Sequence, residues 1–236
     1  MSAPHRSGAL DDPAALAAGD PGGMLGQVAS AGGQARAALA AAQAARLVGP
    51  EPRAVVVAGM GGSGIAGDVL AALAYLRSRV PVLTVKGDRL PAFVGQSTLL
   101  LAVSYSGNTD ETLAAVEEGF SAGARLVAVC SGGRLAELAR QHGEAVVLVA
   151  PGRMPRAALW SLAVPVCLAA AAAGVLDPLA GQVRAAADTL DAEADALGPA
   201  VPTAANPAKQ AALRLVGKLP VAWGSGQLGA VAATRL

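Results

Sequence analysis

Short apolar runs alternate with stretches of helical periodicity along the first part of the chain. The apolar runs have the length of strands and occupy residues 53–58, 80–86, 98–103, 125–130 and 145–149. Between them, apolar positions recur every three or four residues, which is the spacing of an amphipathic helix. Strands that alternate with helices form a parallel sheet with helices packed on both of its faces. The pattern therefore predicts an α/β fold built on a five-stranded parallel sheet.

Longer helical patterns flank this alternating region. An Ala-rich pattern predicts a helix over residues 24–48, ended by a Gly-Pro pair. Residues 157–176 carry no charge, and their length alone would permit a membrane span. Pro165 in the middle of the segment and its high Ala content favour a helix buried against the sheet instead.

The start of the alternating pattern recurs near the end of the chain. Residues 219–229 repeat the strand, glycine-serine turn and helix start of residues 56–67. We therefore expect a second, similar domain to begin there. The expected organisation is a flexible leader (1–23), a first domain (24–176), a partly helical linker (177–206) and the incomplete start of a second domain (207–236).

Composition narrows the class of protein. The net charge of +1 over 236 residues favours neither a nucleic-acid partner nor an anionic membrane surface. Cys130 and Cys167 lie in apolar stretches without a CxxC pair, which indicates buried free thiols in a reducing cytoplasm and no metal site. The Ala- and Pro-rich start of the chain lacks the pattern of a signal peptide.

A cluster of hydroxyl residues follows the third apolar run. It comprises Ser104, Ser106, Thr109 and Thr112. Asn108 followed by Glu111 fits a capping box, so the turn is expected to open a helix whose free N–H groups attract an anion. A turn without lysine suits the phosphate of a small sugar ester. The simpler alternative, that the hydroxyls only cap a helix, is weakened by their number and by their place at a strand end.

The sequence GMGGSG at residues 59–64 satisfies G-x-G-x-x-G between a strand and a helix. This pattern is also found in dinucleotide-binding folds, so an oxidoreductase domain is an alternative. Lys86 occupies the position where such folds favour an acidic residue, which counts against it. A tight turn that needs glycine for packing is the plainest alternative.

Three motifs together resemble the sugar-isomerase (SIS) domain and, more closely, the bifunctional phosphoglucose/phosphomannose isomerase family. They are GMGGSGIAGD at residues 59–68, SYSGNTDET at residues 104–112 and PGRMPR at residues 151–156. The resemblance runs from about Met24 to the end of the chain. It implies a flavodoxin-like SIS fold, two such domains in each subunit, and a homodimer.

The resemblance also implies a reaction and its residues. The reaction interconverts glucose 6-phosphate, and mannose 6-phosphate, with fructose 6-phosphate through a cis-enediol, without metal or cofactor. The implied phosphate-binding residues are Ser104, Ser106 and Thr109. Those implied to line the sugar are Gly61, Gly62 and Ser63. Arg156 is implied to stabilise the oxyanion that develops at C1 and C2.

The family's glutamate base, its ring-opening histidine and the residues that distinguish glucose from mannose are expected beyond Leu236. His5 lies in the leader, His142 is expected on the surface, and Glu111 is better explained as a cap than as a base. Arg153 is expected to be a solvated loop residue, with a second anion contact as the alternative. We therefore expect an inactive fragment of an isomerase, with a non-catalytic sugar-phosphate-binding SIS module as the alternative.

Overall fold

The fold is organised by a five-stranded parallel sheet with the strand order β2-β1-β3-β4-β5. The computed structural model describes residues 7–45, 47 and 49–235. In sheet order the strands are Val82–Val85, Ala54–Ala58, Thr98–Val103, Arg125–Cys130 and Ala145–Leu148. The sheet confirms the fold class predicted from the alternating pattern.

The strand order places a crevice between β1 and β3. The chain passes from β1 outward to β2 and then returns to the other side of β1 to form β3. Connections therefore leave these two neighbouring strands in opposite directions, which opens a crevice at their carboxyl ends. In register, Ala58 at the end of β1 pairs with Ala102 near the end of β3. The turns that follow β1 and β3 meet at this crevice.

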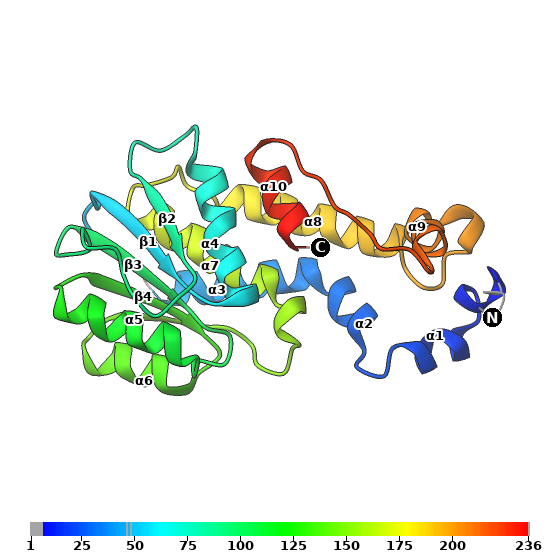
Figure 1. Cartoon of the computed structure of the whole chain (residues 1–236), viewed down its shortest axis with the longest axis horizontal. Helices are drawn as coiled ribbons and strands as arrows, with labels where there is room; N and C mark the ends of the chain where they lie inside the picture. The colour runs from blue at the N-terminus through cyan, green and yellow to red at the C-terminus, as the bar shows by residue number, and fades with distance from the viewer. Residues whose placement is uncertain (1–6, 46, 48, 236) are drawn as a thin grey trace.

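Helices cover both faces of the sheet. One face packs against α3 (Ala31–Ala44), α4 (Gly61–Ala74) and α7 (Leu159–Ala172). The other face packs against α5 (Asp110–Ser121) and α6 (Gly133–Gln141). Figure 1 shows α5 and α6 on one side of the strands and α4 and α7 on the other. Because both faces are covered, all six residues of β3 are buried, and the strand reads as a continuous apolar run.

The uncharged segment 157–176 forms the buried helix α7, as its sequence predicts. Its interior contains Pro165, and nine of its residues are buried. Its 14 residues would extend only about 21 Å, short of the ~30 Å hydrocarbon core of a bilayer. Among the described residues, no helix has both the length and the hydropathy to cross a membrane.

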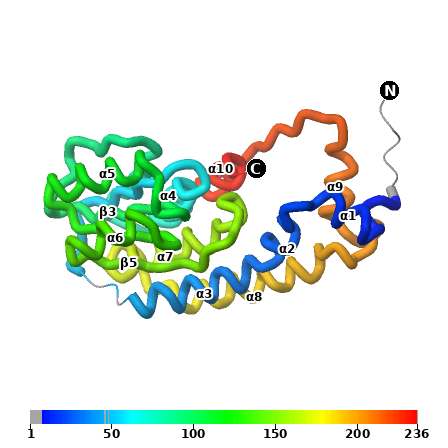
Figure 2. The backbone as a smooth tube through the Cα atoms, turned by 90° about the horizontal axis from the view of Figure 1, so that it is seen from below, coloured from blue at the N-terminus to red at the C-terminus, as the bar shows by residue number. Residues whose placement is uncertain are grey.

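A helical arm, defined as α1 (Pro13–Gly19), α2 (Met24–Ala29), α8 (Ala180–Ala196) and α9 (Pro207–Leu215), extends to one side of the sheet. Its longest member, α8, lies along α3, and Figure 2 shows the two helices side by side. Val183 and Ala187 of α8 are buried in a cluster with Ala35 and Leu39 of α3. The segment expected to be partly helical is thus largely helix and packs on the first region. The boundaries proposed for the domains stay a prediction.

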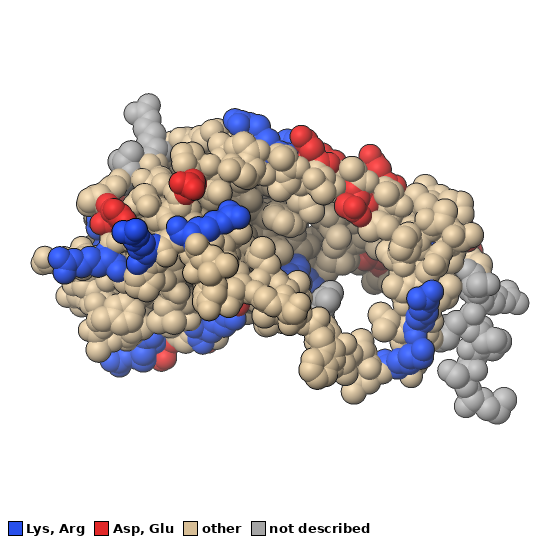
Figure 3. Space-filling view, turned by 90° about the horizontal axis from the view of Figure 1, so that it is seen from above, with Lys and Arg blue, Asp and Glu red and all other residues tan. Residues whose placement is uncertain are grey.

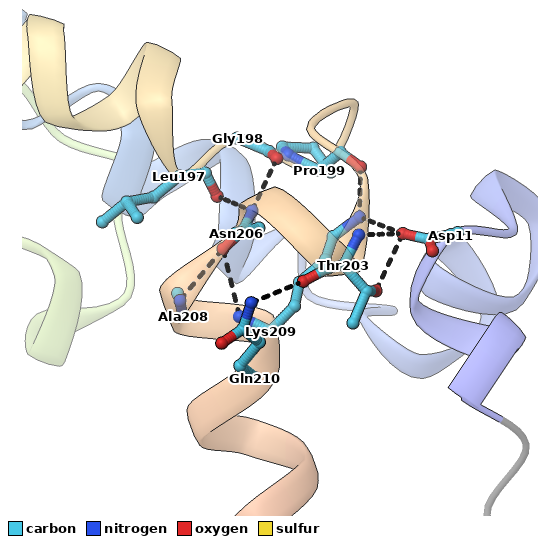
Figure 4. A network of polar contacts seen from close by, with 9 residues as sticks. All are labelled: Asp11, Leu197, Gly198, Pro199, Thr203, Asn206, Ala208, Lys209 and Gln210. Carbon is cyan, nitrogen blue, oxygen red and sulfur yellow. Dashed lines mark hydrogen bonds and ion pairs between the residues drawn. The ribbon is translucent and has the colours of Figure 1, made fainter.

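Polar contacts hold the elbow between α8 and α9 (Figure 4). The fully buried Asn206 accepts hydrogen bonds from the N–H groups of Ala208 and Lys209 and donates to the carbonyls of Leu197 and Gly198. Lys209 Nζ contacts Asp11 Oδ1 at 3.0 Å, which ties the start of the chain to this elbow.

The repeat near the end of the chain forms only in part. Its helix is present as α10 (Gly226–Arg235), which lies beside α4. The strand expected at the start of residues 219–229 does not form in the described structure, and Leu219 and Trp223 are each 91% exposed. An isolated apolar segment without neighbouring strands has no partners for its backbone groups, so it stays unpaired.

Two helices differ in extent from the sequence prediction. The helix expected over 24–48 is divided at Ser30 into α2 and α3, and residues 46 and 48 lie outside the described residues. The helix after the first strand begins at Gly61 rather than Ile65, so the glycine motif forms its first turn. Of the expected leader, residues 1–6 with His5 lie outside the described residues, and residues 7–19 form η1 (Ser7–Leu10) and α1.

Candidate functional site

Four connections meet at the carboxyl edge of the sheet. We call them the glycine turn (residues 59–64, after β1), the hydroxyl turn (104–109, after β3), the brace turn (131–134, after β4) and the arginine loop (150–156, after β5). In a parallel sheet the carboxyl ends of all strands lie at the same edge, so sequence motifs far apart in the chain become neighbours. The three motifs named from the sequence are thus brought to one place.

The hydroxyl turn is folded on itself by its own side chains. Ser104 is buried, its Oγ lies 2.8 Å from Thr109 Oγ1, and it accepts a hydrogen bond from the N–H of Gly107. Ser106 is exposed, and its Oγ accepts from the N–H of Asn108 at 3.2 Å. Ser106 therefore presents its hydroxyl to solvent, whereas Ser104 shapes the turn from within.

The start of α5 offers backbone donors beside these hydroxyls. Thr109 is the N-cap and makes no side-chain capping bond. The N–H groups of Asp110 and Glu111 have no hydrogen-bond acceptor among the residues described. Free N–H groups and the helix dipole at this end attract an anion. The hydroxyl turn and α5 thus form an anion-binding geometry.

The capping box predicted at Asn108 and Glu111 is wrong. Asn108 Oδ1 accepts from the N–H of Arg134 at 3.0 Å, so this side chain caps α6 across the edge of the sheet. Glu111 is exposed. The side chain of Asn108 turns away from its own helix because the brace turn offers it a backbone donor.

Gly107 explains why the hydroxyl and brace turns fit so closely. It has a φ of +71°, and a Cβ at this position would lie 1.8 Å from the carbonyl oxygen of Gly132. Any side chain would collide with the brace turn and would strain the backbone. The hydroxyl turn is therefore packed rigidly against its neighbour.

The glycine turn lies on the other side of the crevice. Ser63 Oγ accepts from the N–H of Tyr105 at 3.4 Å, which joins the glycine turn to the hydroxyl turn. A Cβ on Gly62 would lie 3.4 Å from the carbonyl oxygen of Pro155, so the arginine loop is adjacent. Gly61 is exposed and Gly62 half-buried at this position. These contacts bring the glycine turn next to the hydroxyl turn and the arginine loop.

The two arginines of the arginine loop differ in environment. Arg156, within η2 (Pro155–Ala157), is exposed, and its side chain makes no hydrogen bond or ion pair with the part of the chain that the structure describes. Arg153 is half-buried, its Nη1 donates to Ser30 Oγ at 2.8 Å, and its Nε is buried without a partner. The expectation that Arg153 is a solvated residue is wrong, because it anchors the loop to the α2–α3 junction.

The charged and titratable groups nearest the crevice are engaged elsewhere. Lys86 forms an ion pair with Asp68 at 2.5 Å. His142 lies at the end of α6, stacked on Phe120 with ring centroids 3.9 Å apart, away from the crevice. Cys130 ends β4 beneath the edge, and burial raises the pKa of its thiol. No group of three His, Cys, Asp or Glu residues that could hold a metal occurs in the described ranges.

An apolar cavity of about 470 Å³ lies away from this crevice, in the helical arm, with Leu25, Trp160 and Leu197 among its lining residues. Its one basic group, Lys209, is held by Asp11, so this cavity does not suit a phosphate. On the face seen in Figure 3, Lys and Arg side chains are scattered among acidic ones rather than gathered in one patch. The crevice is therefore the better candidate for a phosphorylated ligand.

Similarity to known proteins agrees with these motifs. The chain is 36% identical over 170 residues to the bifunctional phosphoglucose/phosphomannose isomerase of Caldicellulosiruptor bescii, a match that covers 72% of this chain and 50% of that protein. It is 43% identical over 112 residues to the isomerase of the same name from Thermoplasma acidophilum, covering 48% and 34% of the two chains. This chain resembles the bifunctional phosphoglucose/phosphomannose isomerases. It spans about half the length of the first relative and about a third of the second.

One similar protein carries a different name. The chain is 37% identical over 99 residues to a D-glucosamine-6-phosphate 4-epimerase of Sulfolobus acidocaldarius, covering 42% of this chain and 31% of that protein. No protein-family model matches the chain.

Solved structures show the same fold. A crystal structure of a hypothetical protein from Thermus thermophilus superposes with a TM-score of 0.61 and 20% identity, over 89% of this chain and 52% of that chain. The tagatose-6-phosphate ketose/aldose isomerase of Escherichia coli gives 0.58 and 19%, over 85% and 55%. At these identities the likeness establishes the SIS-type fold.

The sequence analysis missed one residue of this edge, Tyr105. Its backbone and its hydroxyl contact all of the other three connections. The sequence signal that could have indicated it is a tyrosine between two serines at the end of a buried strand. A phenol hydroxyl at that place can reach the backbone groups of neighbouring turns.

Proposed function

We propose that this chain binds the sugar phosphate in a phosphosugar isomerase, which interconverts glucose 6-phosphate, and mannose 6-phosphate, with fructose 6-phosphate. The observation that carries the proposal is the convergence of the hydroxyl turn, the glycine turn and the arginine loop on the crevice between β1 and β3. Ligands of open α/β sheets bind in such a crevice.

Each side of the crevice has a part in this proposal. The hydroxyl turn and the first turn of α5 hold the phosphate: Ser106 and Thr109 contact it, and the buried Ser104 contributes by holding Thr109 Oγ1 in place. The glycine turn lies against the sugar, through Gly61, Gly62 and Ser63. The free guanidinium of Arg156 lies over C1 and C2 and stabilises the negative charge of a cis-enediolate.

The proton that moves between C1 and C2 needs a base that the described residues do not place at this crevice. Glu111 is exposed at the start of α5, Asp68 is paired with Lys86, and His142 lies on Phe120. We propose that the carboxylate base and the ring-opening histidine belong to the part of the longer protein beyond Leu236. Residues 1–236 alone then bind sugar phosphates without interconverting them. The route needs neither metal nor cofactor, because one base carries the proton between adjacent carbons.

The range of the matched relatives supports a sugar-phosphate site more than it supports one reaction. Proteins named as isomerases and a protein named as a 4-epimerase both match this chain. Both names specify a hexose phosphate as the substrate, but they specify different reactions on it. This is the pattern expected where the matched segment supplies phosphate and sugar contacts and another segment supplies the reacting groups.

Calorimetry of the chain with glucose 6-phosphate, fructose 6-phosphate, mannose 6-phosphate, NAD and NADP tests the proposal. We expect the three sugar phosphates to bind and the two dinucleotides not to bind. Dinucleotide binding without sugar-phosphate binding would favour the oxidoreductase alternative. Sugar-phosphate binding by a longer protein that catalyses no interconversion would favour a non-catalytic SIS module.

Two further parts of the proposal concern the whole protein. The resemblance supports pairing of the longer protein as a homodimer, which its sedimentation would measure. Cys130 and Cys167 are both free and buried, which supports a reducing compartment, the cytoplasm.

A further inference from the structure

We propose that Tyr105 is a positioning residue that sets the conformation of the arginine loop and, through it, the place of Arg156. The inference rests on the proposed function only where it concerns the sugar phosphate that Arg156 would contact. Its structural part concerns one hydroxyl group and the two backbone groups that it joins.

The backbone of Tyr105 fixes where its side chain begins. Its N–H donates to Ser63 Oγ of the glycine turn. Its carbonyl oxygen accepts from both the N–H and the Oγ of Ser131 in the brace turn, at 2.9 Å and 2.7 Å. With its backbone held by two neighbouring turns, the residue has little freedom at its Cα. The ring, packed against the buried cluster on the α3–α4–α7 face, extends from this point to the arginine loop.

The hydroxyl group joins the two ends of a Pro-Gly turn. It donates to the carbonyl oxygen of Ala150 at 2.9 Å and accepts from the N–H of Arg153 at 2.8 Å. Pro151 and Gly152 lie between these ends, and Gly152 has a φ of +86°, as the third residue of a type II turn requires. In an ordinary turn of this kind the carbonyl and the N–H bond to each other. Here the phenolic oxygen stands between them and holds the turn open.

The far side of the loop is held separately. Arg153 Nη1 donates to Ser30 Oγ, and the N–H of Met154 donates to Gln27 Oε1 at 2.7 Å. The hydroxyl of Tyr105 is therefore the connection between this loop and the hydroxyl turn. Arg156 follows within the same loop, and its own side chain has no partner among the described residues that could place it. Its position thus depends on the loop backbone, which Tyr105 holds on one side, Ser30 and Gln27 hold on the other, and Arg235 contacts at the Arg156 carbonyl.

Replacing Tyr105 by Phe removes the hydroxyl and keeps the ring. The carbonyl of Ala150 and the N–H of Arg153 then lose the oxygen that joins them and become open to water, so the loop can shift together with the arginines that follow. A displacement of about 1 Å is enough to weaken an oriented contact about tenfold. The phosphate-binding groups of the hydroxyl turn keep their own bonds, so phosphate binding should change little.

Amide hydrogen exchange measures the structural part without any ligand. In Tyr105→Phe we expect the N–H of Arg153 to exchange about tenfold faster or more than in the parent chain, because its acceptor is gone. Tyr75→Phe is the matched control, since Tyr75 is 64% exposed on α4 and lies outside these contacts. Unchanged exchange at Arg153 in a folded Tyr105→Phe chain would overturn the proposal.

A double-mutant cycle measures the link to Arg156. The probes are inorganic phosphate and 6-phosphogluconate, whose C1 carboxylate places negative charge where an enediolate carries it. We expect Tyr105→Phe to weaken 6-phosphogluconate binding about five- to tenfold and phosphate binding less than about twofold. In an Arg156→Ala background, Tyr105→Phe should have no further effect on 6-phosphogluconate.

Other outcomes separate the two proposals. An equal loss for both probes, or the same loss with and without Arg156, would overturn the link from Tyr105 to Arg156. A parent chain that binds neither probe would overturn the proposed function, and hydrogen exchange at Arg153 would then decide the positioning role of Tyr105 alone.

Discussion

Hydroxyl side chains of one turn have unequal roles at the residue scale. Ser104 is buried, and its Oγ is engaged with both Thr109 Oγ1 and the N–H of Gly107. Ser106 is exposed, and one backbone N–H is its contact within the turn. The same residue type thus shapes the turn at one position and is available to a ligand at the other. Substitutions at the two serines should separate stability from binding.

Ser106→Ala should weaken fructose 6-phosphate binding roughly ten- to hundredfold, because a hydrogen bond to a charged group contributes about 1.5–3 kcal/mol. Calorimetry on the folded variant measures the change. Ser121→Ala is the control, since Ser121 lies at the far end of α5. Unchanged affinity in Ser106→Ala would remove this hydroxyl from the phosphate site.

Ser104→Ala should instead lower the free energy of unfolding by about 1–2 kcal/mol, since the half-buried Thr109 hydroxyl loses its partner and the N–H of Gly107 keeps only the Ser104 carbonyl as acceptor. Urea unfolding measures this loss. A variant that binds more weakly but unfolds at the same urea concentration as the parent would contradict the assignment of Ser104 to the interior of the turn.

Cys167 shows how burial alone changes a thiol. Desolvation raises its pKa from the ordinary 9.0 to about 12. Between these values the native chain holds a proton that the unfolded chain has released, so the free energy of unfolding should fall as the pH rises from 9 towards 12. Thiolate absorbance during an alkaline titration tests this, with Cys167→Ala as the comparison. Ionisation of Cys167 near pH 9 in the folded chain would contradict it.

At the scale of elements, two asparagines connect helices rather than extend them. Asn108 caps α6 from the end of the hydroxyl turn, and Asn206 caps α9 while holding the last carbonyls of the α8 end. In both cases one short amide side chain fixes the angle between two elements. The arm and the crevice therefore depend on asparagines that contact a second element as well as capping a helix.

Asn206→Ala should lower the free energy of unfolding by about 2 kcal/mol, the sum of a lost cap and of carbonyls left without donors. In a chain of this length that corresponds to a fall in Tm of roughly 4–8 °C. Asn206→Asp is the matched variant, because it keeps the capping acceptor and loses only the donors. Calorimetric scans that place Asn206→Ala and the parent at the same Tm would exclude the elbow as a stabilising element.

The contact between Asp11 and Lys209 holds residues 7–19 to the elbow between α8 and α9, and this attachment should depend on pH. Hydrogen bonds from Lys209 and Thr203 hold the pKa of Asp11 below its ordinary 3.8. A lowered carboxyl pKa adds stability that is complete above the ordinary value and is lost as the pH falls through the lowered one. Limited proteolysis of residues 7–19 should therefore speed up below about pH 4 in the parent chain. Asp11→Asn should be cleaved quickly at neutral pH as well, and equal rates for the two chains at neutral pH would contradict this role.

At the scale of the whole molecule, the topology decides where a ligand can bind. The return of the chain from β2 to β3 opens the crevice, and the two turns beside it carry the glycine and hydroxyl motifs. The arginine loop reaches the same edge from β5, two strands from β3. The α10 helix also reaches this edge, where Arg235 Nη2 donates to the carbonyl of Arg156.

Residues 1–236 should bind sugar phosphates and should not interconvert glucose and fructose 6-phosphates. A positioned base contributes about 10²–10⁴-fold, and without one the proton has no carrier between C1 and C2. A coupled assay on this chain and on a longer product of the same gene measures the difference. Robust turnover by residues 1–236 would contradict this and would point to Glu111 or His142 as the base.

The sequence by itself determined the strands, the fold class and the three motifs of the site. Strand β3 was predicted at the residues where it forms, because a strand buried on both faces must be apolar throughout. The glycine and hydroxyl turns were found for a related reason, since each lies where an apolar run stops and a helix begins. The local sequence pattern is sufficient to predict features that depend only on residues near one another in the chain.

Only the tertiary structure decided which side chains meet across the edge of the sheet. The hydrogen-bond partner of the Asn108 side chain lies 26 residues away in the chain. The two partners of the Tyr105 hydroxyl lie 45 and 48 residues away, and the partner of Arg153 Nη1 lies 123 residues away. No periodicity in the sequence records contacts between turns, because they depend on strand order and on the angle at which each chain segment leaves the sheet. For the same reason, the strand expected at the start of residues 219–229 stays unpaired: its pattern is local, whereas its hydrogen bonds require neighbouring strands.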